Sequence, residues 1–443
     1  MTRLFGTDGI RGIANVELTP ALAQALGRAV VQRLLPDGGA IVIGQDTRRS
    51  GDMLASALIS GATSMGADVH RAGILPTPAL AFLVAEGGFA AGIMVSASHN
   101  PADDNGLKVL DGRGLKLDDA VEDELEALMS APAVPAGPTN AGLGREIGAR
   151  ALLDRYRQHR LGIARGVGSR LRIVLDCANG SGGVIAPELL RAAGAQVEVI
   201  FGAPDGVNIN LACGATAPEA LAERVRATGA DAGFALDGDA DRCVAVDERG
   251  RVVDGDRLIG LLALERLARG ALAARTVVVS VLSNGGLDEA VSAGGGRVMR
   301  TPVGDKHILD AMLASGAGLG GEKSGHVILA EHAICGDGIV TAMETLRVLA
   351  ATGRTLSALA APIPLYPQEQ RTVPVRHKER WQADAALAEA IHDAERELAG
   401  HGRLLVRPSG TEAALRFMIE GPDATRIAAM ADDLAALAAE RLN

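Results

Sequence analysis

The sequence predicts an α/β protein with three similar domains, each built on a parallel or mixed sheet, and a smaller C-terminal α+β domain around a central cleft. Two observations predict this fold. A pattern of strands alternating with helices recurs three times between residues 40 and 321, and the pattern changes after residue 368. The length of 443 residues agrees, because about 150 residues per domain suggests three or four domains.

Each copy of the repeat begins with an apolar strand-like run, followed by a helix and a second strand. These segments are residues 40–43, 52–65 and the region of Val69; 171–176, 187–193 and 197–201; and 276–282, 287–293 and 297–300. A second helix and a third strand follow in each copy, namely PTPALAFLVAEG with AAGIMV, APEALAERVRATG with DAGFAL, and KHILDAMLASG with GLG. This alternation indicates βαβ units, right-handed crossovers and a largely parallel sheet.

A short polar loop follows the third strand of every copy. The loops are SASHNP at residues 96–101, DGDADR at 237–242 and GEKSGH at 321–326. Ligands of open α/β sheets bind beyond the carboxyl ends of the strands. Equivalent positions in three repeats therefore predict that the three loops contribute to one shared cleft.

Two stretches rich in proline and glycine divide the chain. APAVPAGPTNAG at residues 131–142 and APIPLYP at 361–367 resist continuous helix, and a softer boundary lies near 249–256. The tail then carries a strand-like RTVPV, an amphipathic helix expected from Glu379 to Leu398, the run GRLLVRPSGTE and a last helix from about Ala424. We therefore expect domains at residues 1–140, 150–249, 250–362 and 368–443.

Composition narrows the class of partner. There are 44 basic and 54 acidic residues and only 2% aromatic residues, so we expect no nucleic-acid surface, although local arginines can still bind a small anion. The four cysteines form no CxxC pair, and the N-terminal segment lacks the apolar core of a signal peptide. No window approaches the roughly 20 apolar residues of a membrane span. We expect a cytoplasmic protein that does not bind membranes.

The first loop presents Ser98 between the apolar run IMV and His99. A tight polar turn there can hold the serine hydroxyl out of the sheet, where it could carry a phosphoryl group. The alternative is an ordinary turn, because serine, asparagine and proline all favour turns.

The second loop places Asp237, Asp239 and Asp241 at alternate positions, which suits an oxygen-binding divalent cation such as Mg²⁺. An EF-hand calcium loop is a rival, with Glu248 at its twelfth position. Arg242 stands where that loop needs glycine, however, and the flanking segments look like strands. An Asp-Gly turn without a metal is the other alternative.

The third loop offers a carboxylate, a hydroxyl and an imidazole, from Glu322, Ser324 and His326, a set that suits sugar hydroxyls. GAGLGG at residues 316–321 satisfies GxGxxG, but it follows a helix instead of a strand, so a dinucleotide fold is not expected. Glu322 also interrupts what would be a Walker A loop and argues against an ATPase.

RPSGTE at residues 407–412, with Arg416 nearby, combines arginines, hydroxyls and an exposed backbone, which suits a phosphate dianion. An ordinary turn accounts for the same stretch equally well. The N-terminal GTDGIRG adds Arg11, with the same two interpretations.

Five ordered motifs, FGTDGIRG, SASHNP, DGDADR, GEKSGH and RPSGTE, make the chain similar to the α-D-phosphohexomutase superfamily over essentially its whole length. The resemblance implies three similar α/β domains and a C-terminal domain of the TATA-box-binding-protein-like type. They would carry, in order, a phosphoserine, a metal, a sugar and a phosphate. Further motifs, PDGVNINLACGAT at 204–216, CGDGIV at 335–340 and LYPQ at 365–368, resemble the bacterial phosphoglucosamine mutase branch.

This resemblance implies an isomerase that converts glucosamine 6-phosphate to glucosamine 1-phosphate, a step toward UDP-N-acetylglucosamine and the peptidoglycan of the cell wall. Ser98 would be the phosphoserine, with glucosamine 1,6-bisphosphate as intermediate, and Mg²⁺ would be bound by the Ser98 phosphate and the three aspartates. Arg11 and Arg242 would assist. The partner would be a phosphosugar, and a homodimer is possible.

The resemblance also implies roles for residues around this centre. Lys108, supported by His99, would be the general acid/base, which requires its pKa to fall from about 10.4. The remaining expected site residues are Glu322, Ser324 and His326 for the sugar, and Arg407, Ser409, Gly410, Thr411 and Arg416 for a phosphate.

The chain departs from the branch pattern at a few positions. Lys323 stands where glutamine is usual, Ala413 where proline is usual, and Lys306 with His307 where arginine and an aromatic residue are common. Because the third loop reads the sugar, a phosphomannomutase or phosphoglucomutase is the nearest alternative. A metal-dependent sugar phosphatase, in which water accepts the phosphoryl group, is a second alternative, and an inactive phosphosugar-binding protein a third.

Overall fold

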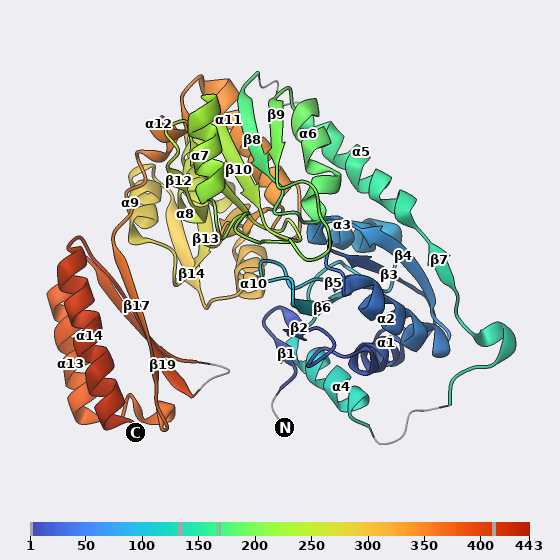
Figure 1. Cartoon of the computed structure of the whole chain (residues 1–443). Helices are drawn as coiled ribbons and strands as arrows, with labels where there is room; N and C mark the ends of the chain where they lie inside the picture. Colours follow the sequence, from blue (N-terminus) through green and yellow to red (C-terminus); the bar gives the residue numbers. More distant parts are fainter. Residues whose placement is uncertain (1–2, 132–135, 166, 168–169, 410–412) are drawn as a thin grey trace. The chain divides into compact units, whose positions relative to one another are not determined.

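The computed structural model describes residues 3–131, 136–165, 167, 170–409 and 413–443 (Figure 1). Contacts divide the chain into two compact units. The first is Met1–Val281 with Met299–Ala361, and the second is Leu282–Val298 with Pro362–Asn443. The boundaries of the four domains that the sequence predicts stay a prediction.

The first sheet has seven strands in the order β1-β2-β6-β5-β3-β4-β7. Its strands are β1 (Phe5–Gly6), β2 (Gly9–Ile13), β3 (Ala40–Gln45), β4 (Asp68–Ile74), β5 (Ala91–Val95), β6 (Asp104–Asp111) and β7 (Glu146–Gly148). β5, β3, β4 and β7 are parallel, whereas β6 returns antiparallel beside β5. The predicted α/β class with parallel or mixed sheets is confirmed.

The next two sheets repeat this plan, with parallel strands and an antiparallel return. Their orders are β12-β11-β10-β8-β9 and β14-β13-β15-β16. The strands are β8 (Arg172–Asp176), β9 (Gln196–Ile200), β10 (Ala232–Leu236), β11 (Cys243–Asp247), β12 (Val252–Val253), β13 (Thr276–Ser280), β14 (Arg297–Thr301), β15 (Leu319–Gly321) and β16 (Val327–Leu329).

Helices alternate with these strands along the chain (Figure 1). They are α1 (Pro20–Leu34), α2 (Gly51–Ser64), α3 (Thr77–Gly87), α4 (Asp119–Met129), α5 (Leu153–Ala164), α6 (Ala186–Ala192), α7 (Glu219–Thr228), α8 (Gly255–Ala268), α9 (Gly285–Ala293), α10 (Asp305–Ser315), α11 (Gly338–Thr352) and α12 (Leu356–Ala360). Within the described part of the chain, none of the helices has both the length and the apolar character needed to span a bilayer.

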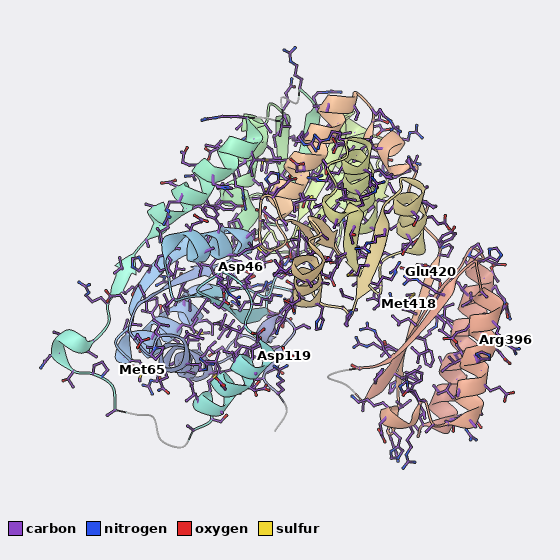
Figure 2. All side chains as sticks on the ribbon, turned by 180° about the vertical axis from the view of Figure 1, so that it is seen from behind. Asp46, Met65, Asp119, Arg396, Met418 and Glu420 are labelled. Carbon is purple, nitrogen blue, oxygen red and sulfur yellow. The ribbon has the colours of Figure 1, made fainter. Side chains whose placement is uncertain are left out.

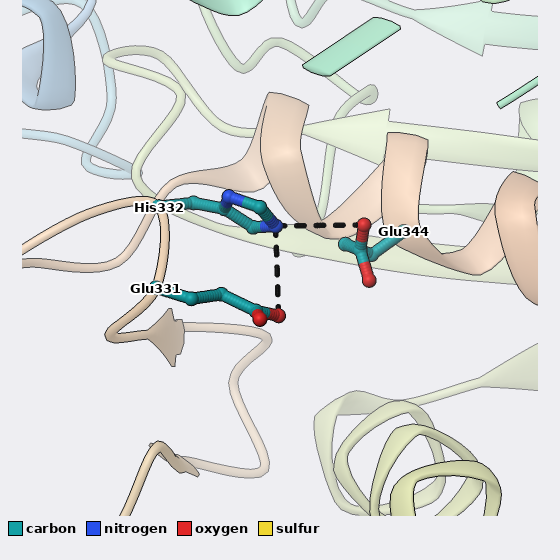
Figure 3. Close-up of side chains that lie close together, drawn as sticks. All are labelled: Glu331, His332 and Glu344. Atoms are coloured by element: carbon teal, nitrogen blue, oxygen red, sulfur yellow. Dashed lines mark ion pairs between the residues drawn. The ribbon is translucent and has the colours of Figure 1, made fainter. Parts of the chain in front are cut away.

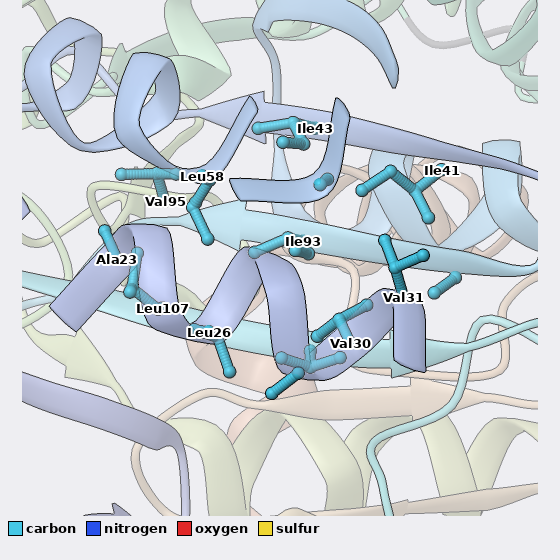
Figure 4. Packing of buried hydrophobic residues seen from close by; sticks show 14 of the residues in the cluster. Ala23, Leu26, Val30, Val31, Ile41, Ile43, Leu58, Ile93, Val95 and Leu107 are labelled. Carbon is cyan, nitrogen blue, oxygen red and sulfur yellow. The ribbon is translucent and has the colours of Figure 1, made fainter. Parts of the chain in front are cut away.

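The core of the first sheet shows why these residues form strands. Ile41 and Ile43 lie two residues apart on β3, and Ile93 and Val95 lie two residues apart on β5. These side chains face α1 and α2 (Figure 4). Alternate side chains point to opposite faces of a strand, and Val42, between the two isoleucines, is also fully buried. The sheet is therefore covered on both faces, as parallel sheets require.

Each predicted loop lies in a hairpin of the same kind, between a parallel strand and its antiparallel neighbour. SASHNP connects β5 to β6, DGDADR connects β10 to β11, and the loop at residues 322–326 connects β15 to β16. In every case a buried parallel strand ends and its antiparallel neighbour begins within a few residues. The polar side chains therefore lie at the carboxyl end of a rigid strand.

The second unit contains an antiparallel sheet, β17-β19-β18, with strands β17 (Gln368–Pro374), β18 (Arg403–Pro408) and β19 (Ala414–Glu420). Its helices are α13 (Ala385–Leu398) and α14 (Ala424–Arg441). α13 starts six residues later than the expected Glu379, because the side chain of Asp384 caps the helix by accepting from Leu387 N at 3.0 Å. The predicted last helix, from about Ala424, is confirmed.

Glu420, on β19, ties the sheet of the second unit to the start of α9 (Figure 2). Its carboxylate accepts hydrogen bonds from Gly285 N at 2.9 Å, Gln368 Nε2 at 2.6 Å and Arg403 Nε at 3.0 Å. A buried carboxylate with three donors is well compensated. These bonds explain why residues 282–298 belong to this unit.

The close packing of α1 on α2 gives a stability prediction. A Cβ added at Gly61 would lie 2.1 Å from the carbonyl oxygen of Gln24, so Gly61→Ala forces the two helices apart. We expect a loss of about 1–3 kcal/mol in the free energy of unfolding. Gly162→Ala on α5, where a Cβ meets nothing within 4 Å, is the matched control and is expected to gain up to about 1 kcal/mol. Calorimetric melting of both variants checks this, and equal effects would contradict it.

Candidate active site

The hydroxyl of Ser98 lies against the carboxylates of the second loop. Ser98 Oγ donates to Asp237 Oδ2 at 2.5 Å, and His99 Nδ1 lies 3.3 Å from Ser98 Oγ. Both Ser98 and Asp237 are about 1% exposed. Two loops 139 residues apart in the sequence therefore meet at one point.

Ser98 is held in an unfavourable backbone conformation. Its φ is 53°, in the left-handed region that non-glycine residues avoid, at a cost of about 1–3 kcal/mol. Such a residue persists only where its surroundings determine it. Here the surroundings are the side chains of Arg48 and Asn210.

Arg48, which is buried, gathers the carbonyl groups of the serine loop. Its Nη2 donates to Ser98 O at 3.1 Å and Asn100 O at 2.7 Å, and its Nη1 donates to Pro101 O and to Asp104 O at 2.9 Å. A guanidinium has five N–H groups in a rigid fork, so it can bind several carbonyls at once. Arg48 therefore fixes the path of the loop on both sides of the serine.

Asp46 anchors this arrangement from the end of β3 (Figure 2). It pairs with Arg48 Nε at 2.9 Å and accepts from Ser96 Oγ at 2.6 Å, while Ser96 Oγ accepts from Ser98 N at 2.9 Å. Asn210, which lies between β9 and α7, donates through its Nδ2 to Ser98 O at 2.9 Å. The serine loop is thus held on its amide and its carbonyl side.

Asp237, Asp239 and Asp241 form a compact carboxylate cluster. Each offers an oxygen within 4.8 Å of the others, and all three residues are buried. Thr77 Oγ1 donates to Asp239 at 2.6 Å, and Lys108 Nζ lies 2.6 Å from Asp239 and 3.7 Å from Asp241. Asp239 Oδ1 and Asp241 Oδ1 accept no hydrogen bond from any described residue.

The donor set fits a divalent cation. Burial, and then the neighbouring charges of Asp241 and Asp239, raise the pKa of Asp237 well above its usual range. Asp239 is buried as well, but Lys108 lowers its pKa. Two of the carboxylate oxygens accept no hydrogen bond from a described residue, and hard oxygen ligands of this kind suit Mg²⁺. The residues therefore fit the group that the sequence predicts there.

Lys108, on β6, does not show the lowered pKa expected of a general acid/base. Burial would lower its pKa, but Asp239 and Asp241 outweigh burial and raise it. In this arrangement Lys108 is an ammonium group paired with Asp239. His99 shows the opposite behaviour, because burial, Arg242 and Arg11 lower its pKa to about 4, so that it is neutral at pH 7.

Arg11 and Arg242 also lie in this part of the first unit. Arg11 pairs with Asp8 at 3.1 Å and donates to Asn100 Oδ1 at 3.4 Å. Arg242 Nε lies 3.9 Å from Asp241 Oδ1. Both guanidiniums act electrostatically on His99, beside the serine.

The third loop lies next to the carboxylate cluster. His326 Nδ1 is 3.8 Å from Asp241 Oδ2, and Gly325 O accepts from Cys243 N at 2.9 Å, at the start of β11. Glu322 accepts from Gly304 N at 3.2 Å. The hydroxyl oxygen of Ser324 is buried and has no hydrogen-bond partner among the described residues, so it is available to a ligand.

A second group of possible metal ligands, Glu331, His332 and Glu344, is already neutralised (Figure 3). His332 Nε2 lies 3.5 Å from both carboxylates. Arg266 Nη2 also pairs with both, at 2.5 and 3.0 Å, and Arg347 pairs with Glu344 at 3.1 Å. Guanidinium groups occupy the positions that a cation would need, so we interpret this group as an ion-pair network.

The fourth predicted motif lies in the second unit. Arg407 on β18 pairs in register with Arg416 on β19, and burial together with the charge of Arg416 lowers the pKa of Arg407. Both arginines line a small pocket with Gln370 and Thr372. Ser409 follows β18 and accepts from Lys378 Nζ at 2.6 Å through its carbonyl oxygen. The predicted Gly410 and Thr411 lie outside the described residues.

Four contact residues of the serine and metal loops were missed by the sequence analysis: Asp46, Arg48, Thr77 and Asn210. For Asp46 and Arg48 the available signal was QDTRRS at residues 45–50, which continues from the end of β3 as SASHNP continues from β5. Because β3 and β5 are parallel neighbours, their following loops must lie side by side.

A buried serine, a carboxylate cluster, two arginines and a lysine in one place define the class of protein. This combination of groups suits phosphoryl transfer, because cations can neutralise the charge of the transferring group.

Family comparisons agree with this class. Four models match in order: phosphoglucomutase/phosphomannomutase alpha/beta/alpha domain I at residues 2–133, domain II at 154–250, domain III at 254–366 and the C-terminal domain at 372–437. A phosphoglucosamine mutase of Moorella thermoacetica is 50% identical over 428 residues, 96% of each chain. One from Symbiobacterium thermophilum is 48% identical over 440 residues, 98% of each.

Solved structures share the fold. A phosphoglucomutase/phosphomannomutase family protein of Burkholderia thailandensis matches with a TM-score of 0.83 and 26% identity, covering 100% of this chain and 99% of that one. The Aspergillus fumigatus N-acetylphosphoglucosamine mutase in complex with GlcNAc-6P and magnesium matches with a TM-score of 0.68, 21% identity and coverage of 99% and 95%. The chain belongs to the phosphoglucomutase/phosphomannomutase family and is an isomerase of the phosphohexomutase class.

The position of Arg48 gives a prediction for activity. Arg48→Lys keeps the charge but cannot bind Asp46 and four carbonyl groups together, so the serine loop loses its fixed path. We expect phosphohexose turnover to fall about 10–100-fold, as for other residues that orient a reacting group. Steady-state kinetics measure the effect. Arg49→Lys, at the adjacent exposed position, is the control, and a loss no larger than in that control would disprove the role of Arg48.

Proposed function

We propose that this chain interconverts glucosamine 6-phosphate and glucosamine 1-phosphate through a phosphoserine at Ser98. The observation that carries the proposal is the placement of Ser98 Oγ, 2.5 Å from a buried carboxylate cluster that fits a divalent cation. The sugar assignment is supported by relatives at 48–50% identity over nearly the whole chain, which are named phosphoglucosamine mutases.

In the first half-reaction, a hydroxyl oxygen of the sugar phosphate attacks the phosphorus on Ser98. The new P–O bond to the sugar forms as the bond to Ser98 Oγ breaks, and the product is glucosamine 1,6-bisphosphate. The step moves one proton from the sugar hydroxyl to Ser98 Oγ. Lys108, whose ammonium group lies 2.6 Å from Asp239, would pass its own proton to Ser98 Oγ and take up the proton of the sugar hydroxyl. The second half-reaction returns the other phosphate to Ser98.

Asp237, Asp239, Asp241 and the Ser98 phosphate are the proposed ligands of Mg²⁺. When bound, the ion supplies positive charge that spreads the charge of the transferring group. Arg11 and Arg242 add two fixed guanidinium groups near the serine. Neutral His99 supports Ser98 as a hydrogen-bond partner.

Glu322, Ser324 and His326 are the proposed sugar contacts, because they follow β15 and one of them, His326, lies 3.8 Å from Asp241. Arg407, Ser409 and Arg416, with Gly410 and Thr411, are the proposed contacts of the phosphate that is not reacting. Two arginines paired across neighbouring strands match the charge of a phosphate dianion.

The state of the cysteines bears on where the protein works. Three of the four cysteines are buried and none forms a disulfide, which supports the proposal of a cytoplasmic enzyme. The product would serve the synthesis of UDP-N-acetylglucosamine and peptidoglycan. A homodimer stays a prediction.

Mass spectrometry with a turnover assay tests the phosphoserine. We expect one phosphoryl increment on Ser98 in the wild type and none there in Ser98→Ala, with turnover of glucosamine 6-phosphate reduced on the order of 10³-fold or more because the nucleophile is gone. Ser60→Ala, on the exposed face of α2, is the control. Phosphate on another residue, or full activity of Ser98→Ala, would overturn the mechanism.

The same assay separates the alternatives. A mutase yields glucosamine 1-phosphate, whereas a phosphatase releases inorganic phosphate. Comparison of glucosamine, glucose and mannose 6-phosphates tests the sugar, and we expect the highest kcat/KM for glucosamine 6-phosphate. A higher value for glucose or mannose would replace the proposed substrate without affecting the role of Ser98.

A further inference from the structure

The motif CGDGIV, at residues 335–340, has no role in the site as described so far. It forms the turn between β16 and α11. We call Cys335–Gly338 the CGDG turn. Its backbone contacts two of the catalytic loops, which a surface turn would not do.

The first contact is with His326. Gly336 N donates to His326 Nε2 at 3.1 Å. A neutral imidazole has one nitrogen that donates and one that accepts. Because Nε2 accepts from Gly336, the ring proton belongs on Nδ1, and a proton on Nε2 would face another N–H group.

The Nδ1 atom of His326 faces the cluster of aspartates, 3.8 Å from Asp241 Oδ2. Asp305 is the other charged group near the ring, with Oδ2 3.6 Å from Nε2. That separation exceeds a hydrogen bond, and Asp305 instead accepts from Lys116 Nζ at 2.7 Å. The contact with Gly336 therefore decides the tautomer.

Gly336 and the ring lie too close for any side chain between them. A Cβ at Gly336 would be 2.5 Å from His326 Cε1 and 2.6 Å from both ring nitrogens. The second contact of the turn is with the metal loop, where Gly338 N donates to Ala240 O at 3.0 Å. One turn therefore touches both the sugar-binding and the metal-binding loops.

The turn is itself held by Asp337. This carboxylate caps α11 by accepting from Ile339 N and Val340 N at 3.1 and 3.0 Å. It also accepts from Tyr156 Oη at 2.7 Å and pairs with Arg160 at 3.0 Å.

Asp337, Tyr156 and Arg160 are each at most 2% exposed. Arg160 stacks over Tyr156, on its own helix α5, and over Phe82 on α3. Ion pairs buried this deeply fix geometry, because breaking one leaves an uncompensated charge.

We propose that the CGDG turn sets the tautomer of His326, so that its N–H at Nδ1 faces the substrate beside Asp241, with Tyr156 and Arg160 holding the turn through Asp337. Gly336, Asp337, Tyr156 and Arg160 are positioning residues, and His326 is the group that donates to a substrate oxygen. The proposal rests on the proposed function only in taking His326 as a substrate contact.

Nitrogen NMR of enzyme labelled with ¹⁵N-histidine tests the tautomer directly. The His326 signals are assigned as those absent from His326→Gln. We expect a protonated Nδ1 and an unprotonated Nε2 in the resting enzyme. A proton on Nε2, or averaging between tautomers as in free imidazole, would overturn the proposal. This measurement needs no substrate, so it stands even if the enzyme acts on another hexose phosphate.

A double-mutant cycle tests the consequence for the reaction. We expect Gly336→Ala to lower kcat/KM about 10–100-fold in the wild type and to have no further effect in His326→Gln. Gly162→Ala, without neighbours at its Cβ, is the control. Equal losses in both backgrounds would show that Gly336 acts independently of His326.

If Gly336→Ala does not fold, Tyr156→Phe removes one hydrogen bond to Asp337 without adding an atom. It is then expected to allow tautomer averaging at His326. An unchanged spectrum in that variant would contradict the role of Tyr156.

Discussion

The contact between Ser98 and the three buried carboxylates is the constraint on which the rest of the site depends. At separations of up to 4.8 Å, each pair of carboxylate charges repels by about 3–4 kcal/mol at an effective dielectric constant of about 20, besides the cost of removing each from water. Lys108 pairs with Asp239, and Arg242 lies near Asp241. One oxygen of Asp239 and one of Asp241 still accept no hydrogen bond from a described residue, so these carboxylates suit a divalent cation. Their mutual repulsion also explains why the loops that carry them must be held in place by other contacts.

Two buried ion pairs hold the loops in place. Asp46 with Arg48 fixes the serine loop through its carbonyl groups, and Asp337 with Arg160 fixes the turn behind the metal and sugar loops. Asp46 and Arg48 follow β3, whereas Asp337 caps α11 and pairs with Arg160 on α5. Arg48 binds the backbone of the serine loop directly, and Asp337 holds a turn whose own backbone binds the other two loops. The positions of Ser98 and His326 therefore depend on buried side chains outside the three predicted loops. Rigid loops also agree with a mutase, which must keep its phosphoserine in one position through two transfers.

Much of this arrangement could be predicted from the sequence because it follows from repetition. Three copies of one strand and helix pattern place Ser98, Asp237 and His326 after equivalent strands, and aspartates at alternate positions favour a divalent cation. The same pattern places QDTRRS beside the serine loop, but it does not predict the role of Arg48, because this residue binds carbonyl groups whose positions depend on the folded loop. The raised pKa of Lys108 is likewise a property of its neighbours, and the late start of α13 depends on which of several polar residues forms the cap.

Divalent-metal binding to the purified, metal-free enzyme tests the central claim most directly. Titration calorimetry with Mg²⁺ or Mn²⁺ is predicted to show one ion per chain, lost in Asp237→Asn and retained in Glu331→Gln, which alters the other candidate cluster. Binding that survives in Asp237→Asn but disappears in Glu331→Gln, or no binding to the wild type, would contradict the account.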